Sequence, residues 1–112
     1  MTHLESITQK IVTLDEAKQI VAEWKTAGEK IVFTNGCFDI IHKGHVSYLA
    51  KARDLGTKLI LGLNTDESVK RLKGANRPVK ELESRALTAA SFEYIDLVIP
   101  FSEDTPLKVI ST

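Results

Sequence analysis

A short apolar run at residues 30–33 leads directly into a glycine turn and the start of a helix, Thr34-Asn-Gly-Cys-Phe-Asp-Ile-Ile-His-Lys-Gly-His45. Such a strand–turn–helix unit is typical of α/β proteins. Three of its properties suit phosphate. Gly36 permits a close approach of the backbone to an anion, and a helix start offers N–H groups to it. The imidazoles of His42 and His45 can donate hydrogen bonds to oxygens that gain charge during a reaction.

The composition describes one globular domain and excludes several classes of protein. The chain has 112 residues, of which 43% are hydrophobic and 27% are charged, ordinary values for a globular protein. Lys plus Arg and Asp plus Glu balance at 15 each, so no net basic field attracts nucleic acid or an anionic membrane. The single cysteine excludes an intrachain disulfide and a cysteine-based metal site. Because no apolar run could cross a bilayer and no signal peptide is visible, we expect a cytoplasmic protein.

Helical and strand patterns alternate along the chain. The clearest helix covers residues 14–27, with Thr13 as its N-cap, Glu16 at capping-box distance and Gly28 after its end. The strand at residues 30–34 is apolar on both faces, which favours a central place in a parallel sheet. The other expected strands are 58–63 and 96–99, and Pro100 closes the second of them. The other expected helices are 44–55, 66–72, 82–92 and one from Thr105 onward. In the helix at 44–55, the residues expected to face inward are Val46, Leu49, Ala50 and Ala52.

This alternation predicts an α/β fold, in which a Rossmann-like parallel sheet carries helices on both faces and right-handed crossovers join the strands. We expect a single domain, with a helical segment at residues 1–28 and the Rossmann-like core at residues 29–112. In such sheets ligands bind beyond the carboxyl ends of the strands. Two of those ends are Thr34-Asn-Gly36 and Asn64-Thr-Asp66. The fold and the glycine turn therefore predict a binding site at the same edge of the sheet.

The two histidines of the turn are three positions apart, so His42 and His45 can face the same side of a helix. One alternative is a helix cap and a solvated surface histidine. Another is a zinc site, for which no Cys or Glu sits at ligand spacing nearby. The glycine turn directly upstream favours phosphate binding. Asp39 either orients a histidine, binds Mg²⁺ or substrate, or serves the turn itself, and Cys37 is expected to be a small packed residue.

Basic residues follow the second strand in a polar loop at residues 73–80. A solvated loop is the ordinary interpretation of such a cluster. The loop follows a strand end that opens on the same crevice, and a triphosphate needs cations. We therefore favour a phosphate role for Lys73 and Arg77 and assign Lys80 to the surface. Arg85 begins a helix, where a cation opposes the helix dipole, and this indicates a substrate anion or a carboxylate partner nearby.

Thr34-Asn-Gly-Cys-Phe-Asp39 together with His42-Lys-Gly-His45 resembles the cytidylyltransferase-like branch of the nucleotidyltransferase superfamily, and within it the D-glycero-β-D-manno-heptose 1-phosphate adenylyltransferases. The resemblance extends over nearly the whole chain, including the helix before the first strand. Its further segments are Gly62-Leu-Asn-Thr-Asp66, Ser68-Val-Lys-Arg-Leu-Lys-Gly74, Arg77-Pro78, Arg85 and Val98-Ile-Pro-Phe-Ser-Glu-Asp-Thr-Pro106.

The resemblance implies an enzyme that transfers AMP from ATP to a heptose 1-phosphate and releases pyrophosphate, without a covalent enzyme intermediate. Under this resemblance His42 and His45 stabilise oxygens at the α-phosphorus, and Lys73 holds the triphosphate or the sugar phosphate. Mg²⁺ bridges the phosphates, with no protein ligand assigned to it. Family members commonly pair, so a homodimer is expected. The residues expected at the nucleotide are Thr34, Asn35, Gly36, Cys37, Phe38, Asp39, Gly44 and Asn64, and those expected at the substrate phosphates are Lys73, Arg77 and Arg85.

The family continues after the last helix with another strand and with an Ile-Ser-Thr-Ser-like motif that caps the leaving phosphates. Ile110-Ser-Thr112 has the same residue types as the start of this motif, but it falls where the helix after Thr105-Pro106 is expected, so we treat the match as coincidence. We therefore expect the domain to be truncated at its C-terminal end. Two other functions stay open: cytidylyl transfer to glycerol 3-phosphate or a similar phospho-alcohol, and a fragment that binds nucleotide without turnover.

Overall fold

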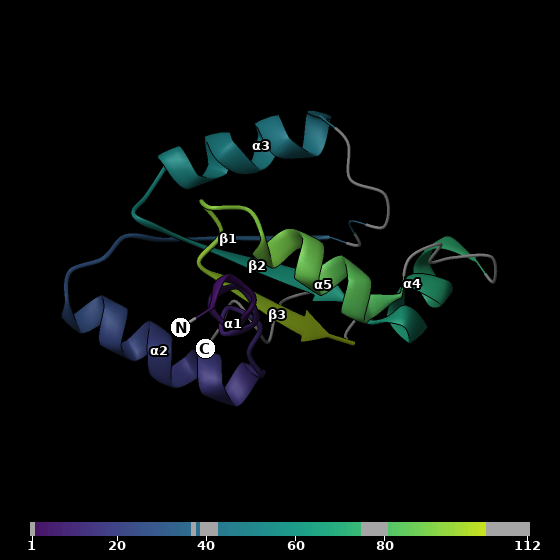
Figure 1. Ribbon diagram of the computed structural model, residues 1–112, viewed down its shortest axis with the longest axis horizontal. Coiled ribbons are helices and arrows are strands. Elements are labelled where there is room, and N and C mark those ends of the chain that lie inside the picture. The colour runs from purple at the N-terminus through teal and green to yellow at the C-terminus, as the bar shows by residue number, and fades with distance from the viewer. Residues whose placement is uncertain (1, 37, 39–42, 75–80, 103–112) are drawn as a thin grey trace.

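The computed structural model describes residues 2–36, 38, 43–74 and 81–102, apart from the side chains of Leu72 and Lys73. The elements in this part of the chain are α1 (His3–Thr8), α2 (Leu14–Thr26), β1 (Ile31–Gly36), α3 (Lys43–Asp54), β2 (Lys58–Asn64), α4 (Asp66–Lys73), α5 (Leu82–Ala90) and β3 (Leu97–Phe101). The described strands form one parallel sheet in the order β1-β2-β3, with helices on both faces (Figure 1). The predicted α/β fold with a parallel sheet is confirmed.

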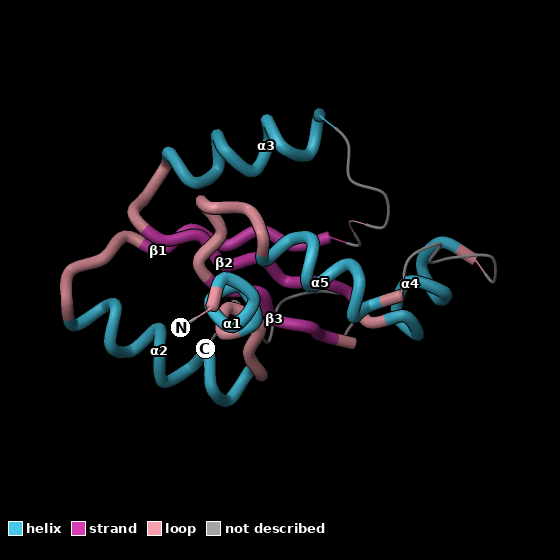
Figure 2. The backbone as a smooth tube through the Cα atoms, viewed as in Figure 1, coloured by secondary structure: helices cyan, strands magenta, loops and turns pink. Residues whose placement is uncertain are grey.

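The sheet lies between two layers of helix (Figure 2). α3 and α5 cover one face, and α2 covers the other. β2 alternates between the two layers, as the period of a strand requires. Leu59, Leu61 and Leu63 are fully buried on the side of Leu49 in α3, whereas Ile60 packs in the cluster on the side of α2. Because β2 is buried on both faces, it forms the centre of the described core.

The α2 face of the sheet is closed by aromatic rings around Gly62 of β2. A Cβ atom at this position would lie 3.0 Å from the Phe101 ring and 3.1 Å from the Phe33 ring. Protein interiors are packed too densely to absorb such contacts without movement. The missing side chain at Gly62 therefore allows both rings to cover the central strand closely.

Gly62→Ala is expected to lower the free energy of unfolding by about 1–3 kcal/mol, because the added methyl group overpacks the aromatic cluster. Urea unfolding at an unchanged m-value measures the loss. Gly56→Ala is the comparison, since a Cβ there would lie 2.5 Å from the backbone carbonyl oxygen of Lys30. Backbone yields less readily than a ring, so Gly56→Ala should cost more. A Gly62→Ala variant as stable as the parent would contradict the packing described around β2.

Capping boxes begin the two helices of the N-terminal segment. The predicted one is confirmed: the Thr13 hydroxyl accepts from the Glu16 backbone N–H at 3.2 Å, and the Glu16 carboxylate accepts from the Thr13 N–H at 3.0 Å. α1 begins in the same way with Thr2 and Glu5. It lies within the helical segment predicted for residues 1–28, but no separate helix with its own cap was predicted there. The hydrogen bonds to each threonine hold the pKa of Glu5 and Glu16 below its usual value. Both caps therefore weaken as the pH falls through these lowered pKa values.

The strands differ from the predicted ones in extent and position. β1 continues to Gly36 instead of ending at Thr34, because its pairing with β2 runs on to the Gly36–Leu63 pair. β2, rather than β1, is central in the described sheet. Pro100 lies within β3 instead of closing it. In the described sheet, the outer side of β3 carries an isolated bridge between Val98 and Ile11 rather than a full ladder, and proline is tolerated in an edge strand of this kind.

The helices follow the predicted ones with small changes at the ends. In α3, Leu49 is buried as expected, but Val46 is 41% exposed. Leu49 is the buried residue of α3, so the inward face of this helix is narrower than the one predicted. No helix in the described ranges is long and apolar enough to span a membrane. Among the same residues, no group of three or more His, Cys, Asp or Glu side chains could hold a metal ion. The loop was predicted over residues 73–80, but Lys73 is the last residue of α4. Residues 75–80 and the helix predicted from Thr105 lie outside the described residues.

Candidate nucleotide site

The carboxyl ends of β1 and β2 lie side by side at one edge of the sheet. Gly36 pairs in register with Leu63, and Asn64 is the last residue of β2. The helices that follow these strands, α3 and α4, both begin at this edge (Figure 1). The edge therefore brings together the two chain segments at which the sequence predicts a ligand. We call it the strand-end edge.

Phe38, between β1 and α3, has an unusual backbone conformation. Its backbone φ is 45°, a left-handed conformation that is costly for a residue other than glycine and that clusters at functional sites. Its ring is buried and lies over Gly36, where a Cβ atom would be 2.6 Å from the ring. The glycine is therefore needed here for the packing of Phe38. A close approach of Gly36 to phosphate stays a prediction.

The Phe38 ring in turn holds an imidazole at the strand-end edge. His45 lies in the first turn of α3, and its ring packs against Phe38 with centroids 5.2 Å apart and planes at 59° to each other. A tilted contact of this kind is a favourable arrangement for two aromatic rings. One of the two predicted catalytic histidines is thus placed beside the predicted phosphate-binding turn.

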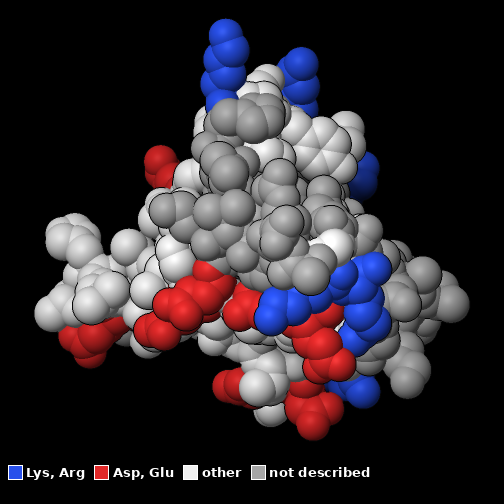
Figure 3. Space-filling view, turned by 90° about the vertical axis from the view of Figure 1, so that its right-hand side faces the viewer, with Lys and Arg blue, Asp and Glu red and all other residues white. Residues whose placement is uncertain are grey.

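The first turn of α3 differs in charge from that of every other described helix. α1, α2, α4 and α5 each carry an acidic residue in the first turn, and α3 carries none. Its exposed Lys43 adds a positive charge instead. Figure 3 faces this end of the molecule: basic side chains stand at the top, where α3 lies, and acidic and basic side chains mix below. A helix start free of carboxylates suits an anion, because the helix dipole and the first N–H groups favour negative charge.

Two tyrosine hydroxyls tie α3 to the rest of the fold. Tyr48 Oη lies 3.1 Å from Thr34 Oγ1 near the end of β1. Tyr94, from the connection between α5 and β3, donates from its hydroxyl to the Val46 carbonyl at 3.0 Å, and burial raises the pKa of Tyr94 above its usual value. Neither tyrosine was predicted at the site, because each bond joins residues far apart in the sequence. The one available signal is that Tyr48 follows His45 by one helical turn.

Asn64 is buried where β2 meets α4. Its Nδ2 donates to Ser68 Oγ at 2.8 Å, and the residue is 3% exposed. Thr65 is the N-cap of α4, with its hydroxyl accepting a hydrogen bond from the Ser68 backbone N–H. Thr65 thus begins the helix that the sequence predicts from residue 66. A contact between Asn64 and a nucleotide stays a prediction.

Arg85 is a buried charge behind the strand-end edge, with 1% of its surface exposed. Its Nη1 donates to the Asn64 carbonyl at 2.7 Å, and its Nη2 donates to Asp66 Oδ1 at 2.7 Å. Arg85 therefore joins α5 to the end of β2 and to the first turn of α4. Of the two predicted partners, a substrate anion and a carboxylate, the structure contains the carboxylate. A direct contact with substrate phosphate stays a prediction.

Several predicted site residues lie outside the described part of the chain: Cys37, Asp39, His42 and Arg77. Lys73 is the last residue of α4, and its side chain is not described either. Brought together at the strand-end edge are Thr34, Asn35, Gly36, Phe38, Gly44, His45 and Asn64, with Arg85 behind them.

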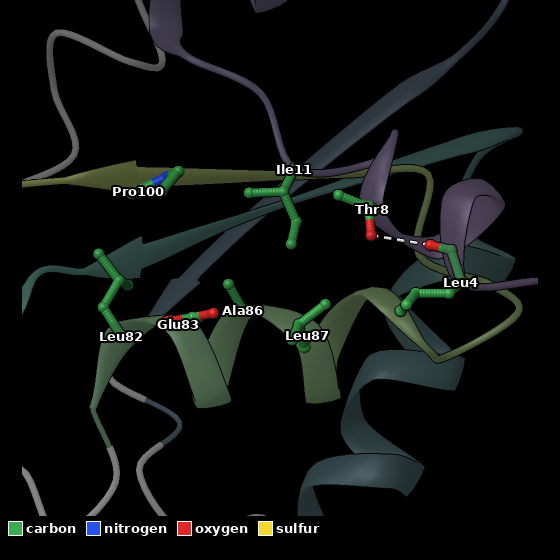
Figure 4. Close-up of a pocket in the computed structure, with 8 residues that line it drawn as sticks. All are labelled: Leu4, Thr8, Ile11, Leu82, Glu83, Ala86, Leu87 and Pro100. Atoms are coloured by element: carbon green, nitrogen blue, oxygen red, sulfur yellow. Dashed lines mark hydrogen bonds between the residues drawn. The ribbon is translucent and has the colours of Figure 1, made fainter.

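An apolar groove lies apart from these residues, between α1 and α5 (Figure 4). Its volume is about 490 Å³, and no predicted site residue lines it. Apart from Thr8 and Glu83, its lining side chains are hydrophobic. A triphosphate would lose its hydration there without compensating hydrogen bonds. The strand-end edge is therefore the better candidate for a nucleotide.

Known proteins resemble this chain in sequence and in fold. The model of the cytidylyltransferase-like family matches residues 33–112. The chain is 54% identical over 108 residues to the bifunctional protein HldE of Actinobacillus pleuropneumoniae serotype 5b (strain L20), and 53% identical over 103 residues to the bifunctional protein HldE of Magnetococcus marinus. These matches cover 96% and 92% of this chain but 23% and 21% of the two relatives, so the chain spans less than a quarter of their length.

A solved structure shares the fold. The lipopolysaccharide core biosynthesis protein from Thermoplasma volcanium GSS1 superimposes with a TM-score of 0.66 at 29% identity, over 74% of this chain and 66% of that one. Fold and sequence together place the chain among the α/β nucleotidyltransferases. It belongs to the cytidylyltransferase-like family, as the sequence predicts, and the matched region contains the turn after β1, α3 and the end of β2.

Proposed function

We propose that this chain forms a nucleotidyltransferase domain that transfers AMP from ATP to a sugar 1-phosphate, specifically a heptose 1-phosphate, and releases pyrophosphate. The observation that carries the proposal is the contact between the His45 and Phe38 rings, which holds an imidazole at the start of α3. Membership of the cytidylyltransferase-like family supports the reaction class. A structural relative named for lipopolysaccharide core biosynthesis supports a sugar phosphate as the acceptor.

In the proposed reaction, an oxygen of the sugar phosphate attacks the α-phosphorus of ATP. A new phosphorus–oxygen bond forms, and the bond from the α-phosphorus to the bridging oxygen breaks. Pyrophosphate leaves with the electron pair of that bond. Because no side chain forms a covalent bond, catalysis depends on alignment of the two phosphates and on stabilisation of the charge that develops between them.

The residues of the strand-end edge have distinct roles in this proposal. The His45 imidazole donates a hydrogen bond to an α-phosphate oxygen as that oxygen gains charge. The N-terminal turn of α3, with the exposed Gly44, binds neighbouring phosphate oxygens. His42 supplies a second imidazole, and Lys73 an ammonium group on the triphosphate. Asn64, the last residue of the adjacent strand, is assigned to the nucleotide pocket in this proposal.

Mg²⁺ fits this proposal as an ion that enters with the nucleotide. Asp66 offers a carboxylate near the strand-end edge, but this carboxylate forms an ion pair with Arg85. Mg²⁺ is commonly held through substrate phosphates and water with few protein carboxylates. Phosphate oxygens then supply most of its ligands, and the bound ion neutralises charge on the triphosphate. Asp39 is the candidate for any further protein ligand.

Pyrophosphate release tests the proposed function directly. The chain is incubated with Mg²⁺ and either ATP or CTP, against a panel of sugar 1-phosphates that includes heptose 1-phosphate, and against glycerol 3-phosphate. We expect release with ATP and heptose 1-phosphate at a rate well above every other pair. Absence of release with ATP and every sugar 1-phosphate would contradict the proposal.

Cytidylyl transfer is the second candidate, favoured by the family to which the chain belongs. It predicts release with CTP and glycerol 3-phosphate, or with a similar phospho-alcohol, in the same assay. Calorimetry separates both enzymes from a third function, a domain that binds nucleotide without turnover. That function predicts heat of binding with ATP or CTP and no pyrophosphate with any acceptor.

A further inference from the structure

We propose that Tyr48 is a positioning residue that sets the orientation of the His45 imidazole through its hydrogen bond to Thr34. The kinetic consequence rests on the proposed function, whereas the effect on the imidazole itself rests on geometry alone. The relevant distance is 3.1 Å between Tyr48 Oη and Thr34 Oγ1. Tyr48 is not among the site residues that the sequence predicts, and its hydroxyl acts here through Thr34 rather than on the substrate.

Two contacts, one helical turn apart, dock the start of α3 onto β1 and the turn after it. The first is between the rings of His45 and Phe38, with centroids 5.2 Å apart. The second is between the hydroxyls of Tyr48 and Thr34. Residues three apart on a helix lie on neighbouring parts of its surface. α3 is also held by the buried Leu49 and by the Tyr94–Val46 hydrogen bond. The hydroxyl contact of Tyr48 adds a directional bond to β1 on the turn next to His45.

The hydroxyl, rather than the ring, of Tyr48 makes this contact specific. Tyr48 is 56% exposed, so its ring contributes little to the buried core. Thr34, by contrast, is 8% exposed and is held in β1 by the pairing of that strand with β2. The Thr34 hydroxyl is therefore a fixed point, and the Tyr48 hydroxyl bonds α3 to it. Loss of one hydroxyl should move the imidazole without unfolding the chain.

Tyr48→Phe isolates this effect, because it deletes the hydroxyl and keeps the ring. The His45 ring nitrogens are observed by ¹⁵N NMR on the 112-residue chain. Their resonances are assigned by comparison with the spectrum of His45→Ala, from which they are absent. We expect Tyr48→Phe to shift the His45 resonances. In the transferase assay kcat should fall about tenfold, which is the change in rate that corresponds to the free energy of one hydrogen bond. KM for the nucleotide should change less than about twofold.

Thr57→Val is the matched control. The Thr57 hydroxyl also ties β1, accepting from the Lys30 N–H at 2.8 Å, but it does so at the opposite end of the strand. We expect it to leave the His45 resonances and kcat unchanged, even if it lowers stability. A second pair of variants tests the partner. Thr34→Val should shift the His45 resonances as Tyr48→Phe does, and Thr34→Ser, which keeps the hydroxyl, should leave them in place.

The results that overturn the inference are distinct from those that overturn the proposed function. His45 resonances of Tyr48→Phe that coincide with those of the parent, or that move equally in Thr57→Val, contradict the positioning role. A parent chain that releases no pyrophosphate contradicts the proposed function, and the NMR comparison still decides the role of Tyr48. The Tyr48→Phe/Thr34→Val double variant gives a further test of the positioning role. Additive losses of kcat in this variant would contradict that role, because the effects of two residues that act through one bond are not additive.

Discussion

His45→Ala is expected to lower kcat by about 10²–10³-fold, because it removes a hydrogen-bond donor aimed at charge that develops at the α-phosphorus. KM for ATP should change far less, since the lost interaction belongs to the transition state. Initial rates of pyrophosphate release over a range of ATP concentrations separate the two parameters. The same fall is expected for His42→Ala.

His3→Ala is the matched control, because His3 lies exposed in α1, in the N-terminal segment. It makes the same chemical change without altering the strand-end edge, and its rate should equal that of the parent. Circular dichroism of His45→Ala checks that loss of the contact with Phe38 leaves the fold intact. A folded His45→Ala variant with the kcat of the parent would show that this imidazole does not act on the reacting phosphate.

Arg85 is expected to contribute to stability through its contacts at the end of β2. Arg85→Met is expected to lower the free energy of unfolding by about 1–3 kcal/mol, because it removes a buried hydrogen-bond donor from the Asn64 carbonyl, whereas the 42% exposed Asp66 side chain can be solvated by water. The group left without its donor is the Asn64 carbonyl, and the Asp66 carboxylate loses its counter-charge. Urea unfolding monitored by circular dichroism measures the change.

Arg71→Met provides the comparison on the surface. Arg71 pairs with Glu67 one turn away in α4, where the two side chains are 42% and 82% exposed, and it also donates to the carbonyl of the exposed Ser102. Exposed pairs of this kind contribute at most about 1 kcal/mol. A loss for Arg85→Met as small as the loss for Arg71→Met would mean that the guanidinium does not hold the end of β2 and the start of α4 together.

Local signals in the sequence predicted the elements well. Thr13 and Glu16 define the start of α2, and the apolar run before Asn64 defines β2, because both signals involve neighbours in the chain. α1 was missed although Thr2 and Glu5 carry the same capping-box spacing. Its six residues are too few for hydrophobic periodicity to identify a helix.

Features that depend on distant partners could not be predicted in the same way. The apolar strand β1 has the composition of a central strand, but strand order depends on pairing across the whole sheet. The carboxylate partner of Arg85 was one of two alternatives, and only the fold brings Asp66 within 2.7 Å of it. The Tyr48–Thr34 contact spans 14 residues and two elements. Sequence alone therefore predicted which chain segments meet at the strand-end edge better than it predicted which side chains hold that edge in shape.

The most direct test of this account is a structure of the chain with ATP and Mg²⁺. We expect the triphosphate at the strand-end edge, against the first turn of α3, with a His45 ring nitrogen about 2.7–3.2 Å from an α-phosphate oxygen. A triphosphate bound elsewhere, or a His45 ring that points away from the phosphates into solvent, would contradict it.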